Sequence, residues 1–465
     1  MMIQIHKNQT NSAQASNSET ELNSENFDQI APKKHNPKIY QKLFKKAQDI
    51  GDKQSEVFAL GRLAMIYQSW GQYREAVQYL QQQLVIIRET NDRYSLANTL
   101  GNLGAAYQSL GQYQEAITHL QEQLAIAQDI GDILALANAC GNLGITYQSL
   151  GQYQQAIEYF KKQLEIAQQI GDKKSEANAL SNLGISYKYQ GDFAQAESLF
   201  FQGLKIHEEL FGGNNPSVAS NLNNLASLYQ DQGKYAEAEP LYQRVLEIRE
   251  KQLGKEHPDV ATSLNNLAAL YHVQGKYTEA EPLYERSLGM MEQLLGAEHP
   301  HLATSLNNLA ELYLAQGKYT EAEPLFLQSL GMMEKLLGAE HPHVATVLNG
   351  LAELYASQGK YAEAEPLYQR ALAIREKQLG AEHPHVANSL NSLAILYQSQ
   401  GKYAEAEPLY QRAIAILIAT LGENHPNTEK AKNNYNLMLS QLPDEELSQR
   451  FSPETVEILR DLRQN

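Results

Sequence analysis

One short sequence recurs along the chain at almost constant intervals. A glycine followed by Gln, Lys or Asp and then by Tyr or Phe occurs at Gly71, Gly111, Gly151, Gly191, Gly233, Gly275, Gly317, Gly359 and Gly401. Successive glycines are 40 residues apart as far as Gly191 and 42 residues apart after it. A fixed period in this range is typical of a solenoid, in which each unit packs mainly against its neighbours. We therefore expect one stacked array rather than a fold around a single central core.

Each unit predicts two helices joined by the glycine turn. In residues 132–170, Asp132 suits the N-cap of the first helix, and Leu143 falls on its apolar face. Gly151 suits the positive φ that ends this helix, and a second apolar stripe through Phe160 follows it. In the later units a Leu-Gly-x-Glu-His-Pro linker precedes the first helix. There, glycine serves as a helix stop and proline as the first helical residue.

Four further positions recur in all nine units. They are a leucine, a small residue directly after it, a tyrosine four residues after the leucine, and an alanine five residues after the turn glycine, as in Leu143, Gly144, Tyr147 and Ala156. Small residues at a helix crossing allow the two helices to approach closely.

This pattern resembles the tetratricopeptide repeat over residues 38–440. The resemblance implies an all-α, right-handed superhelix of helix–turn–helix repeats, with nine full repeats and a half-repeat at each end. The 42-residue form, residues 212–440, resembles the tetratricopeptide domain of kinesin light chains. Residues 51–210 resemble the repeats of Pins-type signalling scaffolds.

Composition and repeat period together divide the chain into four parts. Residues 1–36 are rich in Asn, Gln, Ser and Glu and are expected to be a disordered arm, because they carry too few apolar groups to offset the entropy of ordering. Two arrays follow, residues 37–211 with the 40-residue period and residues 212–440 with the 42-residue period. Residues 441–465 are expected to form a tail with a short helix that begins at Ser452-Pro453.

Charge and motifs exclude several classes of function. The formal net charge of −16 argues against nucleic acid as a partner, because phosphate binding requires clustered Lys and Arg. No apolar run reaches the 18 residues of a membrane span, and Cys140 is the single cysteine, so we expect a cytoplasmic protein. The sequence has no Gly-rich phosphate loop, nucleophile elbow or His-Glu-x-x-His, which predicts a protein that is not an enzyme and has no cofactor.

Five histidines recur every 42 residues, but they do not predict a metal site. They are His257, His299, His341, His383 and His425, each followed by a proline. Equivalent residues of neighbouring repeats are about 10 Å apart, the distance of one packed helix layer. Zinc ligands lie near 2 Å from one centre. We therefore interpret these histidines as part of the turn that starts each first helix.

Asparagines on the outward side of the first helices are the main candidates for ligand binding. In such a superhelix the first helices line the concave face, and an amide side chain offers both donors and an acceptor to a peptide backbone. The resemblance to kinesin light chains also implies peptide contact for these positions. The alternative is that these amides bond to neighbouring helices and fix the stacking. The predicted peptide-binding residues are Asn102, Asn142, Asn182, Asn223, Asn224, Asn265, Asn266, Asn307, Asn308, Asn349, Asn391, Lys188, His272, Glu311 and Glu353.

The sequence thus predicts a scaffold that binds an extended peptide or a partner protein in its concave groove. The neighbouring Glu311 and Glu353 favour a neutral or basic ligand. Two alternatives remain open at this point, a self-assembling structural scaffold and a regulatory arm for a separately encoded enzyme. The oligomeric state also stays open.

Overall fold

The structure is a computed structural model that describes residues 36–450 together with residues 456 and 457. Every regular element in this part of the chain is a helix, and between residues 53 and 421 the helices form nine pairs. The predicted all-α array of helix–turn–helix repeats is therefore confirmed. Residues 1–35 of the predicted arm, and the tail helix predicted from Ser452 except for residues 456 and 457, lie outside the described residues.

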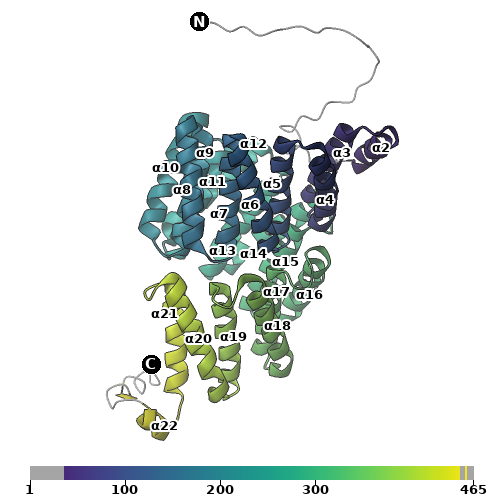
Figure 1. The fold of residues 1–465 in the computed structure, drawn as a ribbon. Helices are drawn as coiled ribbons and strands as arrows, with labels where there is room; N and C mark the ends of the chain where they lie inside the picture. Colours follow the sequence, from purple (N-terminus) through teal and green to yellow (C-terminus); the bar gives the residue numbers. More distant parts are fainter. Residues whose placement is uncertain (1–35, 451–455, 458–465) are drawn as a thin grey trace.

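The helices alternate between a first and a second helix of each repeat (Figure 1). The first helices are α3 (Lys53–Ser69), α5 (Arg93–Ser109), α7 (Ile133–Ser149), α9 (Lys173–Tyr189), α11 (Pro216–Asp231), α13 (Pro258–Val273), α15 (Pro300–Ala315), α17 (Pro342–Ser357) and α19 (Pro384–Ser399). The second helices are α4 (Tyr73–Thr90), α6 (Tyr113–Ile130), α8 (Tyr153–Ile170), α10 (Phe193–Phe211), α12 (Tyr235–Leu253), α14 (Tyr277–Leu295), α16 (Tyr319–Leu336), α18 (Tyr361–Leu379) and α20 (Tyr403–Leu421). The half-repeats are α2 (Pro37–Ile50) and α21 (Pro426–Ser440), and α22 (Asp444–Arg450) follows them.

The predicted caps and turns determine where each helix begins and ends. The Asp132 carboxylate accepts a hydrogen bond from the Ala135 backbone N–H at 3.0 Å, which satisfies one of the unpaired donors at the start of α7. Gly151, in the turn after α7, has a φ of +67°. The longer repeats begin their first helices at a proline, as predicted for the His-Pro linkers. Local sequence therefore sets the length of each helix.

Small residues at the helix crossings bring the two helices of a repeat together. A Cβ atom added to Gly144 would lie 2.5 Å from the Phe160 ring, so only glycine fits at that crossing. In the later repeats alanine replaces this glycine, and Ala268 is fully buried beside Tyr284. The lone Cys140 is also buried, on the apolar face of α7.

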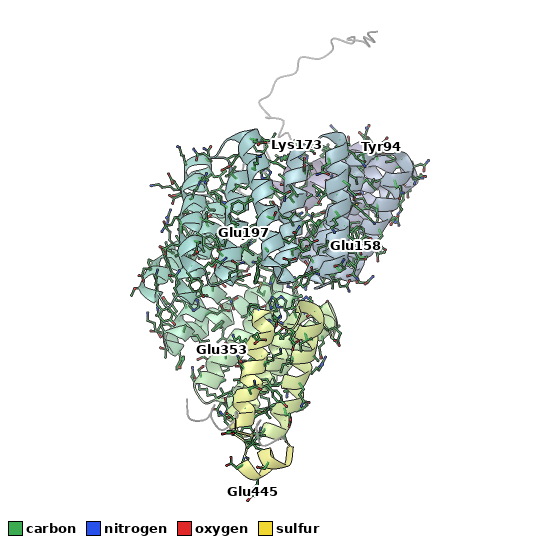
Figure 2. The ribbon with its side chains drawn as sticks, turned by 90° about the vertical axis from the view of Figure 1, so that its left-hand side faces the viewer. Tyr94, Glu158, Lys173, Glu197, Glu353 and Glu445 are labelled. Atoms are coloured by element: carbon green, nitrogen blue, oxygen red, sulfur yellow. The ribbon has the colours of Figure 1, made fainter. Side chains whose placement is uncertain are left out.

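The superhelix winds far enough for its end to pass beneath its beginning. Figure 1 shows α3–α10 above α16–α21, and Figure 2 shows the same two layers after a 90° turn, with Glu158 in the upper layer and Glu353 in the lower one. We call residues 53–211 the upper tier and residues 300–440 the lower tier. Helices α11–α14 connect them. None of the helices in the described part of the chain is long and apolar enough to cross a membrane.

Four turn glycines of the upper tier pack directly on the histidine linkers of the lower tier. A Cβ atom added to Gly71 would lie 2.3 Å from Pro300 Cδ, and one added to Gly111 would lie 2.8 Å from Pro342 Cδ. Gly151 is equally close to His383 and Pro384, and Gly191 to His425. We call this row of four contacts the seam. The turn glycines therefore serve two purposes, because they adopt a positive φ and also leave room for the other tier.

The seam joins each turn to a linker six repeats further along the chain. The turns of repeats one to four meet the linkers that open repeats seven to ten. His257 has the same linker sequence but opens repeat six. The turn six repeats earlier would precede α2, outside the described residues. The side chain of His257 is 28% exposed, whereas residues His299, His341 and His383 are at most 5% exposed. Seam contact thus accompanies the burial of His299, His341 and His383, whereas His425 at the end of the seam is half-buried.

Candidate functional site

Three adjoining cavities follow one another from the seam to α17. Their volumes are about 600, 170 and 390 Å³. The first and second cavities share Asn388 and Asn427, and the second and third share Asn391, Ser392 and Lys430. We call the three together the interior groove. It runs from the seam along the faces of α21, α19 and α17.

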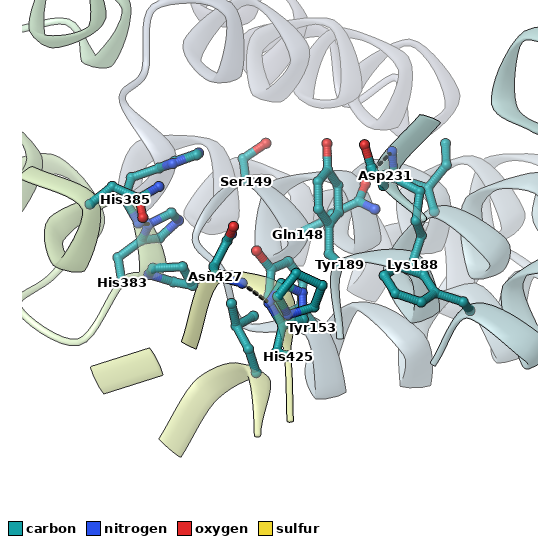
Figure 3. Close-up of a pocket in the computed structure, with 16 residues that line it drawn as sticks. Gln148, Ser149, Tyr153, Lys188, Tyr189, Asp231, His383, His385, His425 and Asn427 are labelled. Atoms are coloured by element: carbon teal, nitrogen blue, oxygen red, sulfur yellow. Dashed lines mark hydrogen bonds and ion pairs between the residues drawn. The ribbon is translucent and has the colours of Figure 1, made fainter. Parts of the chain in front are cut away.

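The seam end of the interior groove lies between the two tiers (Figure 3). The carboxyl ends of α7, α9 and α11 supply one wall, and the amino ends of α19 and α21 supply the other. The rings of Tyr153 and Tyr189 stack with their centroids 5.6 Å apart. Lys188 Nζ lies 2.9 Å from Asp231 Oδ2, so this wall carries an internally neutralised charge pair. This end of the groove thus offers aromatic faces and polar groups. The charges of Lys188 and Asp231 cancel each other.

Three of the seam histidines, His299, His341 and His383, are neutral because each is buried and fixed by two hydrogen bonds. His341 Nδ1 accepts the backbone N–H of His343 at 3.1 Å, and the Ser109 backbone carbonyl accepts a hydrogen bond from the same ring. The neutral ring therefore carries its proton on Nε2. Burial lowers the pKa of His341 from 6.5 to about 3, helped by the neighbouring His343, while the Ser109 carbonyl opposes the shift.

The equivalent histidines behave in the same way. Burial, together with His301, lowers the pKa of His299 to about 4, against a raising effect of the Ser69 carbonyl. Burial lowers the pKa of His383 to about 3, with His385 and Arg375 adding repulsion and the Ser149 carbonyl opposing them. The interpretation of these histidines as helix-start turns is confirmed, because Nδ1 of each caps the following helix. Within the described residues no group of three or more His, Cys, Asp or Glu side chains is arranged to hold a metal ion.

One carboxylate, that of Glu353, lines the far end of the interior groove, and a second, that of Glu311, lies in the preceding repeat outside the cavity walls. Glu353 lines the third cavity, and the low access of water there raises its pKa, while Lys430 lowers it. Glu311 is the equivalent residue of the preceding repeat, and its carboxylate accepts a hydrogen bond from Asn307 Nδ2 at 2.9 Å. Burial raises the pKa of Glu311, with a further contribution from the negative charge of Glu353. Both carboxyls therefore favour a nearby positive charge.

The asparagines form a hydrogen-bonded ladder between neighbouring first helices. Asn266 Nδ2 donates to Asn223 Oδ1 at 2.8 Å, and Asn308 Nδ2 donates to Asn265 Oδ1 at 3.2 Å. Asn434 Nδ2 donates to Asn391 Oδ1 at 3.1 Å in the last repeat. In each case the second asparagine of one repeat donates to the first asparagine of the repeat before it. These amides hold the repeats together, which is the role that the alternative interpretation gave them.

The predicted binding residues fall into three sets in the structure. Lys188, Glu353 and Asn391 line the interior groove. Asn223, Asn265, Asn266 and Asn308 belong to the ladder, and Asn307 contacts Glu311. The remaining residues lie outside the walls of the three cavities: Asn102 is exposed, Asn142, Asn182, Asn224 and Asn349 are half-buried, and the half-buried ring of His272 lies 5.9 Å from that of Tyr277.

Several groove residues escaped the sequence argument. Tyr153 reaches the seam cavity from the upper tier, and Asn388, Asn427 and Lys430 reach the groove from the first two turns of α19 and α21. The sequence argument considered only one face of a single first helix. The turns of the upper tier meet linkers six repeats later because of the pitch of the superhelix. The repeat period alone does not give that pitch.

The ladder predicts a measurable difference between two adjacent asparagines. Asn266→Ala leaves the Asn223 carbonyl without its donor and should lower the free energy of unfolding by about 1 kcal/mol. Asn224→Ala is the matched control, because Asn224 makes no side-chain hydrogen bond to any described residue. Urea unfolding followed by circular dichroism measures both. Equal losses in the two variants would contradict a structural role for the ladder.

Comparisons with known proteins agree with this architecture. A family model described as tetratricopeptide repeat matches residues 55–129, 132–209, 217–293, 259–335, 301–377, 343–419 and 385–442. Nearly identical TPR-like repeats ascribed to a kinesin light chain of Podosopora anserina are 35% identical, with a TM-score of 0.37, covering 44% of this chain and 97% of that chain. BtubC (BKLC) from P. vanneervenii is 27% identical, with a TM-score of 0.40, covering 50% of this chain and 92% of that one.

A third solved structure matches over a longer part of the chain. A Rap protein complexed with Competence and Sporulation Factor is 15% identical, with a TM-score of 0.54, covering 82% of this chain and 99% of that chain. At this identity the likeness concerns the fold alone. No curated protein matches the chain.

Proposed function

The chain belongs to the tetratricopeptide repeat family, and from that premise we propose that it is a non-enzymatic scaffold that binds an extended peptide, or an extended segment of a partner protein, in the interior groove. Proteins built from these repeats generally mediate interactions between proteins. The observation that carries the proposal is the succession of the three cavities, since each shares lining residues with the next. A compact small molecule would need only one of them.

The dimensions and chemistry of the groove suit an extended segment. It crosses three neighbouring first helices, a length of about 20–30 Å at about 10 Å per helix layer. A chain of about six to nine residues at 3.3 Å per residue spans this length. Asn388, Asn391 and Asn427 supply both donors and acceptors along the groove, which matches the groups of a peptide backbone. Tyr189 and Tyr153 supply aromatic surface at one end.

The charges in the groove favour a neutral or basic segment. The seam histidines are neutral at pH 7, and Lys188 is paired with Asp231. Lys430 lowers the pKa of Glu353, whereas no Lys, Arg or His among the described residues contributes to the pKa of Glu311. An acidic segment would therefore add to an existing negative charge. The formal net charge of −16 further disfavours nucleic acid.

A peptide-selection experiment tests the proposed function. Peptides selected on the wild-type protein from a random library should bind at least about tenfold more weakly to the triple variant Asn388→Ala, Asn391→Ala, Asn427→Ala, because each loses hydrogen bonds worth about 1 kcal/mol. Fluorescence anisotropy measures the affinity. Asn102→Ala, an exposed amide outside the three cavities, is the matched control.

Two results would overturn the proposal. One is an unchanged affinity of the triple variant with its fold intact by circular dichroism. The other is concentration-dependent assembly that the triple variant does not alter, together with no selectable peptide. The second result would favour the self-assembling scaffold.

A further inference from the structure

We propose that the far end of the interior groove recognises basic side chains of its ligand at two interruptions of the asparagine ladder, one at Asn307 and Glu311 and the other at Asn349 and Glu353. Glu353 lines the third cavity, and the other three residues lie behind its wall, on the same helix or on the preceding first helix. This inference rests on the proposed function, because it supposes an extended segment in the groove. It adds the chemistry and the spacing that the segment should carry.

The asparagine ladder has a fixed direction of donation. The donor is the second asparagine of a repeat, as in Asn266 and Asn308, and it bonds to the repeat before it. In the next two repeats this donor position is occupied by Gly350 and Ser392. Gly350 cannot be an asparagine in this packing, because an added Cβ atom would lie 2.6 Å from the Phe326 ring. The ladder is therefore interrupted twice in succession and resumes at Asn434.

Each interruption leaves an asparagine side-chain oxygen without its donor. The Oδ1 atoms of Asn307 and Asn349 are buried and have no hydrogen-bond partner among the described residues. Asn307 is only 5% exposed, and its Nδ2 is already committed to the Glu311 carboxylate. A buried carbonyl oxygen without a donor is costly to a folded protein, so it needs a donor from elsewhere. The two interruptions thus present acceptors at positions where the other repeats have satisfied pairs.

A carboxylate accompanies each of the two asparagines that lack a donor. Glu311 follows Asn307 by four residues, and Glu353 follows Asn349 by four residues, which places each pair on one helix face. The equivalent position holds an apolar or small residue in every other repeat, namely Met65, Ala105, Ile145, Ile185, Ser227, Ala269 and Ile395. An acidic side chain therefore occurs only where the ladder donor is missing.

The ligand group follows from these acceptors. An amide oxygen and an ionised carboxylate both require donors, and the carboxylate also favours a positive charge. A guanidinium group meets both requirements because it carries five N–H donors in one plane and remains charged. The raised pKa values of both carboxyls are consistent with a cationic ligand group, because a cation bound beside them would lower these pKa values again. Arginine is thus the preferred side chain, and lysine the second choice.

The spacing of the two sites predicts the spacing of the basic residues. Equivalent residues on adjacent first helices are about 10 Å apart. In a polyproline II segment, side chains three residues apart point to the same side and are separated by about 9 Å. The expected ligand therefore contains two basic residues separated by two others, in the order Arg-x-x-Arg.

A charge-neutral analogue tests this inference directly. The probes are a fluorescein-labelled peptide with an Arg-Pro-Ala-Arg core and the same peptide with both arginines replaced by citrulline, which keeps the shape and removes the charge. Wild-type protein should bind the arginine peptide at least about tenfold more tightly than the citrulline peptide. Glu311→Gln combined with Glu353→Gln should remove this preference, and Ser392→Asn, which restores a ladder donor for Asn349, should reduce it. Glu256→Gln, at an exposed linker residue, is the charge-matched control and should leave the preference unchanged.

The outcomes separate this inference from the proposed function. If both peptides bound equally, or if the double glutamine variant kept the full preference, the basic-residue sites would be refuted. The groove would still be supported if both affinities fell in the variant Asn388→Ala, Asn427→Ala. If neither peptide bound at millimolar concentration, the inference would be overturned. The proposed function would be overturned as well only if the library selection also yielded no peptide. Thermal unfolding of each variant shows that its fold is retained.

Discussion

Replacing Gly71 and Gly111 with alanine is expected to open the superhelix along the seam, whereas the same change at Gly275 and Gly317 is expected to leave it closed. All four glycines have φ values between +68° and +73°. An alanine at a positive φ costs about 1–2 kcal/mol through local strain, and this cost is common to both pairs. The comparison therefore isolates the contact between the tiers.

The difference comes from what a methyl group would meet. At Gly71 and Gly111 the added Cβ would approach Pro300 and Pro342 to 2.3 and 2.8 Å, which is too close for any real contact. These prolines start α15 and α17, so they cannot move without shifting a helix. At Gly275 and Gly317 no atom lies within 4 Å of the added Cβ. Overpacking costs about 1–3 kcal/mol per site, so the seam pair should lose about 2–6 kcal/mol more than the control pair.

Two measurements check this expectation. Small-angle X-ray scattering should show a larger radius of gyration for the seam pair than for wild type, because separation of the tiers lengthens the molecule. Urea unfolding should show the additional loss of stability. Equal behaviour of the two pairs would mean that the tiers do not hold each other in solution.

The seam also shows the limit of what the sequence could predict. Repeat length, helix caps and the small residues at helix crossings are local, so Asp132, Gly144 and Gly151 could be assigned correctly from the sequence. Contact between Gly71 and Pro300 depends on the pitch of the whole superhelix, which accumulates from small rotations at every repeat. No single residue encodes that pitch.

The sequence did contain one unused indication of the seam. The turn glycine is followed by glutamine in the first three repeats, by Asp192 in the fourth, and by lysine in the last five. In the structure these lysines lie over the tyrosine rings of their own turns, as Lys276 does over Tyr271 at 5.4 Å. The turns without lysine are the four that face the lower tier. A bulky charged side chain is thus absent where another surface covers the turn.

The candidate site was partly visible in the sequence for a similar reason. The sequence predicts that the asparagines lie on the concave face, but whether they face a ligand or each other depends on which amide donates to which. The replacements at Gly350 and Ser392 are plain in the sequence. Their meaning required the direction of the ladder, which only neighbouring helices in space can show. The partners of Asn307 and Asn349 therefore could not be deduced from the repeat pattern.

Acidification is the second change expected to have a large effect, because it charges the seam histidines. The pKa of His299 is about 4 and those of His341 and His383 are about 3, all below the ordinary value of 6.5. The unfolded chain therefore binds more protons than the folded chain as the pH falls below about 6.5. The free energy of unfolding should consequently fall between about pH 6.5 and pH 3–4, by up to about 3 kcal/mol for His299 and about 5 kcal/mol for each of His341 and His383.

Opposing groups are few, and their sign is known. The pKa values of Glu311 and Glu353 are raised, so their protonation stabilises the folded chain as the pH falls toward their range. Arg375 remains charged beside His383 and increases the repulsion once that ring is protonated. Other histidines act in the same direction as these three, because burial also lowers the pKa of His425 in the seam and that of His385, the latter to about 4. The histidines outnumber the two carboxyls, which leaves a net loss of stability. The loss should be concentrated at the seam, because all three rings lie there.

The triple variant His299→Asn, His341→Asn, His383→Asn tests the assignment. Asparagine can still cap the helices but does not titrate, so the variant should be less stable than wild type at pH 7 and should lose less stability on acidification. His257→Asn is the matched control, since this residue caps α13 in the same way but meets no turn glycine, and it should keep the wild-type pH dependence. Urea unfolding from pH 7 to about pH 4 gives the dependence, and scattering over the same range shows whether the tiers separate. If the triple variant and wild type lost stability in parallel, the acid sensitivity would belong to other groups, and the seam would be held by shape rather than by neutral imidazoles.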